Sequence, residues 1–162
     1  MERWELPELY CPFPSLVNRH ADVVGRSTLE WAGRHGLLTE PNQRYRLEAV
    51  RVGWLIARTN PTTSLEALQL LADWCTWLFL QDDQCDERGI GKDPDAVAAI
   101  HSRSYEVLAG ASLRRDDRPL TRALVDLRER LMVRARPGWM ERFLNAVAGS
   151  FNASIWEAGN RA

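Results

Sequence analysis

The sequence predicts an all-α protein, a single-domain helical bundle. The chain has 162 residues, which is close to the roughly 150 residues of a typical domain. Apolar residues recur at helical spacing in six segments that Pro, Gly or helix-capping residues separate. No stretch alternates apolar and polar residues with the period of two that is typical of a strand. We therefore expect helices joined by short loops.

The first half of the chain contains three of these segments. Pro7, Pro12 and Pro14 predict an extended lead-in, because proline disfavours helix at its own position and at the residue before it. Helices are predicted over residues 18–34, 43–58 and 64–86. In the second, Leu47, Val50, Trp54 and Leu55 share one side. Ser64 is the expected N-cap of the third, with Glu66 in its first turn.

The second half is divided in the same way. Gly89, Gly91 and Pro94 predict a loop after the third helix, and a charged loop follows at residues 114–118. Helices are predicted over residues 95–111, 119–135 and 139–162. Pro119 is suited to the first turn of a helix, and Pro137-Gly138 is a strong stop signal.

Composition and charge exclude several classes of protein. A net charge of −1 gives no basic footprint for nucleic acid or for an anionic membrane surface. Cys11, Cys75 and Cys85 are odd in number and form no CxxC pair, so neither a disulfide framework nor a cysteine-type zinc site is supported. The longest apolar run, residues 74–80, is too short for a membrane span. We expect a reduced, cytoplasmic protein.

The third helix carries the residues that point to chemistry. On a helix, Leu68, Ala72, Cys75, Phe79, Asp82 and Asp86 fall within about 40° of one line. The apolar stripe therefore ends in two carboxylates one turn apart, at a helix C-terminus that disfavours anions. A solvated acidic helix end is one interpretation. Because the helix is apolar on nearly all sides, we favour a site for a hard cation such as Mg²⁺.

Five stretches resemble one family in the same order along the chain. Residues 79–87 resemble the aspartate-rich motif of class I terpene synthases, the bacterial sesquiterpene and diterpene cyclases in particular. Residues 10–14 resemble the family's N-terminal lead-in, and residues 30–32 with 36–38 resemble its first helix and the turn after it. Residues 51–61 resemble the helix that precedes the metal-binding helix, and residues 156–161 resemble its Trp-Glu…Asn-Arg stretch.

The resemblance implies a reaction and roles for particular residues. A complete enzyme of this family binds an isoprenyl diphosphate, here farnesyl or geranylgeranyl diphosphate, through Mg²⁺, ionises it and guides the carbocation to a cyclic terpene. By resemblance, Asp82 and Asp86 are the metal ligands, and Asp82 and Asp83 are catalytic, Asp83 through hydrogen bonding. Phe79 and Arg161 are expected to contact the substrate's cation and diphosphate, with core packing and solvent exposure as their alternatives.

Other residues are assigned no part in this chemistry. Trp54 and Trp77 are expected in the core. His20, His35 and His101 form no HExxH motif and accompany no nucleophile pattern, so no role is assigned to them.

The chain is about half as long as members of the family it resembles. The second metal motif, Asn…Ser…Glu, has no match in it. Residues 1–162 are therefore expected to form part of the α-domain, its N-terminal half, and to need a complementing half or a second copy as partner. A non-catalytic paralogue that serves as a helical association module is the alternative, as are a split-enzyme half and a piece of a longer protein.

Overall fold

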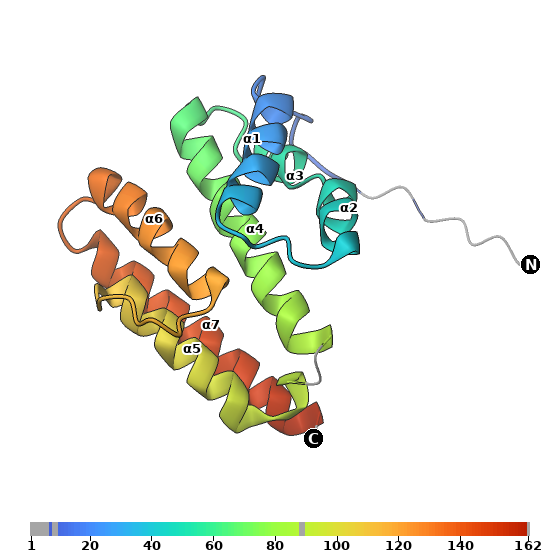
Figure 1. Ribbon diagram of the computed structural model, residues 1–162. Helices are drawn as coiled ribbons and strands as arrows, with labels where there is room; N and C mark the ends of the chain where they lie inside the picture. Colours follow the sequence, from blue (N-terminus) through green and yellow to red (C-terminus); the bar gives the residue numbers. More distant parts are fainter. Residues whose placement is uncertain (1–6, 8–9, 88–89, 162) are drawn as a thin grey trace, which may run out of the picture.

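Helices make up the regular structure of the computed structural model, which describes residue 7, residues 10–87 and residues 90–161 (Figure 1). The side chains of Pro41 and residues 85–87 lie outside this description. No strand occurs in the described part, so the all-α prediction is confirmed. The elements are α1 (Ala21–Arg34), α2 (Pro41–Val50), α3 (Val52–Thr59), α4 (Leu65–Glu87), η1 (Ile90–Lys92), α5 (Pro94–Ala109), α6 (Pro119–Arg134) and α7 (Trp139–Arg161).

The long helix α4 lies between two groups of helices (Figure 1). Its first half packs against α1 and α3, and its later turns contact α6 and η1, while α5 lies along α7. Trp77 is fully buried at this junction, and its indole Nε1 donates a hydrogen bond to the Leu120 carbonyl at 2.8 Å. The prediction of Trp77 as a core residue is confirmed, whereas Trp54 is only partly buried.

The first helix begins three residues later than predicted, at Ala21. Asn18 does not join it because its side chain makes other hydrogen bonds. Its Oδ1 accepts from the His20 backbone N–H at 3.1 Å, and its Nδ2 donates to the carbonyls of Asn60 and Thr63 at 3.1 and 2.8 Å. Asn18 thus ties the start of α1 to the turn between α3 and α4.

The single helix predicted over residues 43–58 is wrong, because the chain breaks at Arg51 into α2 and α3. Arg51 adopts the left-handed conformation, with φ 53° and ψ 48°. The break turns Gly53 toward α1, where its backbone lies against that of Gly25. It also changes the buried face: Val52, Gly53 and Ala57 are buried, while Val50 and Leu55 are exposed.

The predicted helix ends of α4 and α5 agree with capping interactions in the structure. The Ser64 hydroxyl accepts from the Ala67 N–H at 3.4 Å, which confirms the N-cap. Asp93 caps α5 by accepting from two backbone N–H groups, and Gly110 ends that helix at φ 110°. Part of the loop predicted between them is the short turn η1, which includes Gly91, while Gly89 lies outside the described residues.

A buried carboxylate holds α4 in place between α1 and α6. Asp73 accepts hydrogen bonds from Gln69 and Arg130, each at 2.8 Å, and from the Thr28 hydroxyl. Burial raises the pKa of Asp73, and the hydrogen bonds from Thr28, Arg130 and Gln69 act against that rise. The network fixes the helix whose far end carries the aspartates.

Two further sequence-based expectations concern cysteines and membranes. Cys11 and Cys75 are free thiols, and Cys85 lies outside the described side chains. Across the described residues, no helix is both long and apolar enough to cross a bilayer.

Candidate functional site

A cavity of about 330 Å³ lies between α4, η1, α5 and α7. The last turns of α4 and α7 lie at the same end of the molecule (Figure 1). Three of the residues singled out from the sequence line the cavity together: Phe79 and Asp82 on α4, and Arg161, far along the chain, on α7. The wall combines apolar side chains with polar and charged ones, which are seven of the fourteen lining residues.

The aspartates occupy the last turns of α4. Asp82 is exposed and extends into the cavity, and Asp83, beside it, is half-buried. Asp86 lies on the same helix, but its side chain is outside the described residues. In the part of the chain that the structure describes, no three His, Cys, Asp or Glu side chains gather closely enough to hold a metal ion by themselves. A metal at Asp82 therefore needs further oxygen ligands.

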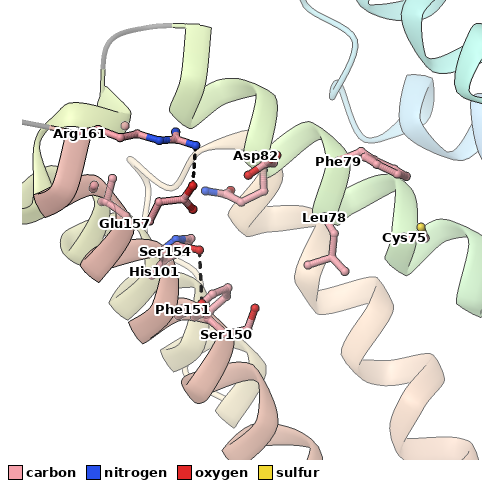
Figure 2. Close-up of a pocket in the computed structure, with 14 residues that line it drawn as sticks. Cys75, Leu78, Phe79, Asp82, His101, Ser150, Phe151, Ser154, Glu157 and Arg161 are labelled. Carbon is pink, nitrogen blue, oxygen red and sulfur yellow. Dashed lines mark hydrogen bonds and ion pairs between the residues drawn. The ribbon is translucent and has the colours of Figure 1, made fainter. Parts of the chain in front are cut away.

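Arg161 lies across the cavity from Asp82, on the last turn of α7 (Figure 2). Its Nη2 forms an ion pair with the Glu157 carboxylate at 2.7 Å, four residues earlier on the same helix. The two helices thus present an aspartate and a paired arginine to one space. Glu157 was missed from the sequence as a cavity residue, although the spacing of four residues to Arg161 could have indicated the pair.

The apolar wall comes largely from α4. Phe79 is 37% exposed and Leu78 is 40% exposed, and both line the cavity. The stripe predicted on this helix is buried at its start, where Leu68 and Ala72 are fully buried, and becomes exposed toward Phe79. Cys75 lies between Ala72 and Phe79 on this stripe. Burial raises the pKa of its thiol, which is thus protonated at neutral pH.

His101 is a cavity residue that the sequence reasoning missed. It lies on α5, is 5% exposed, and stacks on Phe151 of α7 with ring centroids 4.2 Å apart. Burial lowers its pKa to about 4. A signal existed, because His101 falls on the buried stripe of its helix with Val97 and Ser104. A histidine on an apolar stripe is more often a core residue, and the sequence alone does not show the cavity beside it.

The match of a family model decides the family. The model described as terpene synthase family 2, C-terminal metal binding, matches residues 73–162, which include the aspartates and Arg161. The chain belongs to this family. The family is described as metal-binding, in agreement with the divalent-metal interpretation of the aspartate-rich helix.

Curated relatives from bacteria extend the match over nearly the whole chain. The (+)-T-muurolol synthase of Roseiflexus castenholzii, which cyclises farnesyl diphosphate, is 44% identical over 94% of this chain and 47% of its own. The germacrene A synthase of Nostoc punctiforme is 37% identical over 96% of this chain and 48% of its own. The chain thus spans about half the length of the curated relatives it matches.

Solved structures show the same partial coverage. Hedycaryol synthase superposes with a TM-score of 0.84 at 26% identity, covering 99% of this chain and 52% of that one. Germacradien-4-ol synthase from Streptomyces citricolor gives a TM-score of 0.81 at 29% identity, covering 96% and 51%. The predicted fold class is confirmed: the chain has about half of the class I terpene synthase α-fold.

Proposed function

We propose that this chain, the N-terminal half of a class I terpene synthase domain, supplies one wall of a site that ionises and cyclises an isoprenyl diphosphate. The observation that carries the proposal is the shared cavity of Asp82 and Arg161, with Phe79 in its wall. A carboxylate that attracts cations and a guanidinium that suits diphosphate face one space beside an apolar surface. That combination fits a substrate with a charged head and a hydrocarbon tail.

The donor set fits Mg²⁺. The carboxylate of Asp82 reaches the cavity from an exposed position, and Mg²⁺ is commonly held by one or two carboxylates together with substrate phosphates. Asp82 and Asp86 are the proposed ligands, and Asp83 supports them through hydrogen bonding. When bound, Mg²⁺ neutralises the charge that develops on the diphosphate leaving group.

Arg161 and Phe79 act on opposite ends of the substrate. Arg161 is proposed to donate hydrogen bonds to the diphosphate, while its ion pair with Glu157 holds the guanidinium at the cavity. Phe79 presents an aromatic ring that stabilises a nearby carbocation through its face. The surrounding apolar wall limits the access of water, which would quench the cation.

The substrate is proposed to be farnesyl or geranylgeranyl diphosphate, in keeping with the farnesyl diphosphate cyclising relatives. Because the chain spans about half of each relative, the opposite wall and its metal ligands come from a complementing C-terminal half, or from a second copy of the chain in a homodimer.

A second candidate function is a non-catalytic association module. Apolar side chains that the described residues leave uncovered favour it, including Leu71 and Leu78 on α4 and Trp156 on α7. Such surfaces drive association with other chains. The two functions differ in whether the aspartates bind a metal.

Calorimetric titration with Mg²⁺ and inorganic pyrophosphate tests the proposal on the 162-residue chain. We expect the chain to bind the pair, and Asp82→Ala to weaken that binding by about tenfold or more. The melting temperature of Asp82→Ala should not fall, because removing an anion from a helix C-terminus relieves repulsion. Asp116→Ala, which removes an exposed loop carboxylate, is the control. Equal binding by wild type and Asp82→Ala contradicts the metal assignment and favours the association module.

A further inference from the structure

His101 is a buried polar side chain that the proposed reaction does not use. It lines the cavity from α5, and it also lines a second pocket between α5 and α7, so it forms part of the partition between the two. Neither ring nitrogen has a hydrogen-bond partner within the described part of the chain. The imidazole is held by stacking on Phe151, with ring planes 11° apart.

An imidazole in this position costs the fold stability. A neutral imidazole carries one N–H donor and one acceptor, and burying both without partners forfeits their hydration. A phenylalanine would stack on Phe151 without that cost. A buried polar group that weakens the fold therefore calls for another explanation, and the cavity beside it supplies one.

The charge state of His101 limits what it can bind. With a pKa of about 4, the ring is neutral at pH 7. Asp82 and Glu157 line the same cavity, but burial is the cause of the shift in the pKa of His101. A neutral imidazole offers a phosphate or carboxylate one N–H donor and no positive charge, so it binds them less strongly than a charged imidazole does. It can accept a hydrogen bond from a neutral hydroxyl group or donate one to it.

The side chains around His101 indicate what the part of the ligand beyond its hydroxyl group should be. Val97, Leu78 and Phe151 form the apolar part of a wall that also holds polar and charged side chains. Ser154 also lines it, but its hydroxyl donates to the Ser150 carbonyl at 3.3 Å, which leaves only its acceptor capacity. Figure 2 shows His101 and Ser154 on the α5 and α7 side, opposite Asp82. The matching ligand is an apolar molecule with one neutral hydroxyl group.

We propose that His101 is a specificity-determining residue that binds the hydroxyl group of an apolar ligand and gives this cavity its preference for alcohols over hydrocarbons. Both nitrogens are shielded in the ligand-free chain, so contact requires the imidazole to turn about its Cβ–Cγ bond, and the turn exchanges part of its stacking on Phe151 for the hydrogen bond to the ligand. In the reaction proposed above, the ligand is a terpene alcohol product, and that assignment rests on the proposed function. The binding preference does not.

The test compares a cyclic alcohol with its hydrocarbon. Cyclodecanol and cyclodecane are titrated into the 162-residue chain, and binding is measured without Mg²⁺ or diphosphate. We expect the wild type to bind cyclodecanol about tenfold more tightly, as one hydrogen bond to a buried group would give. His101→Phe should lose this preference and retain its affinity for cyclodecane. His101→Gln, which keeps a donor and an acceptor, should retain much of it.

Two controls make the result decisive. His20→Phe replaces a histidine outside the cavity and should bind both ligands as the wild type does. The ¹⁵N chemical shifts of the His101 ring should change with cyclodecanol and not with cyclodecane. An alcohol preference that persists in His101→Phe, an absence of preference in the wild type, or an absence of binding overturns the proposal. Because metal and diphosphate are absent, these outcomes are independent of the Asp82 titration.

Discussion

At the scale of residues, His101 and Asp82 show how surroundings set chemistry. Asp82 is exposed near the end of α4 and lines the cavity. His101 is buried on the opposite side of the same cavity, and its charged form is disfavoured. One cavity thus places a charge-attracting group at its mouth and a neutral polar group in its wall. The pH dependence of folding follows from the second of these.

The buried imidazole should make the protein less stable in mild acid. The pKa of His101 is about 4 in the folded chain against 6.5 for the free side chain, so the unfolded chain binds the extra proton first. Stability is fully present above pH 6.5 and falls as the pH drops from 6.5 toward 4. The expected loss is about 3 kcal/mol of unfolding free energy.

Urea denaturation between pH 7 and pH 4 checks this dependence, with His101→Gln as the matched variant. In His101→Gln, the loss of unfolding free energy between pH 7 and pH 4 should be much smaller than in the wild type. The effect can be separated from that of Asp117, because Arg103 holds the pKa of Asp117 at about 2, and that contribution is lost only as the pH falls from 3.8 toward 2. A wild type and variant with parallel stability profiles would show that His101 is not the responsible group.

At the scale of elements, the contact between α1 and α3 explains the break that periodicity did not predict. A Cβ built on Gly53 would lie 2.5 Å from the backbone of Gly25 and 2.7 Å from the Ala21 carbonyl. The helices meet backbone to backbone, and a straight helix through Arg51 would not present Gly53 there. The guanidinium of Arg51 lies 4.8 Å above the Trp54 ring, which offsets part of the cost of its left-handed backbone.

Gly53→Ala should therefore force α1 and α3 apart. We expect a loss of about 2 kcal/mol or more in unfolding free energy, since the clashing atoms are backbone and cannot move aside as a side chain would. The midpoint of guanidinium denaturation measures it. Gly149→Ala on α7 is the control, because nothing lies within 4 Å of its added methyl group. That variant should gain roughly 0.5–1 kcal/mol. A Gly53→Ala protein as stable as wild type would contradict the close contact.

At the scale of the whole molecule, the chain covers its core but leaves one side of α4 open. The residues Leu71, Leu78 and Phe79 are each more than a third exposed, and the proposed metal ligand Asp82 follows Phe79 by one turn. The curated relatives have about twice this length, which is enough to supply the second wall. For the 162-residue chain to catalyse cyclisation alone, its helices would have to enclose a water-excluding cavity with about half the chain length of the relatives.

We expect the purified chain not to cyclise farnesyl or geranylgeranyl diphosphate in the presence of Mg²⁺, and to elute above its monomer mass of 18.5 kDa. Gas chromatography of the extract and light scattering measure the two properties. As a complementation arm, the remaining half of the Roseiflexus castenholzii relative is added in trans, and a cyclic product should then form. A cyclic terpene made by a monomeric 18.5 kDa species would contradict this prediction.

The sequence by itself determined the helical class, most helix ends and the family. Helical periodicity, Pro and Gly punctuation, and capping residues such as Ser64 are local signals, and local hydrogen bonding sets them. The aspartate-rich stretch predicts the helix of the proposed metal site for the same reason, because the motif depends on residue spacing along one helix.

Only the tertiary structure decided the break at Arg51, the shared cavity and the position of His101. Gly53 meets Gly25 and Asp82 faces Arg161 across distances in sequence that no helical period spans. The role proposed for His101 depends on the helix that packs over it and on the lack of hydrogen-bond partners for its ring nitrogens among the described residues. These properties arise from packing between elements, where close approach, burial and the lack of water change what a side chain can do.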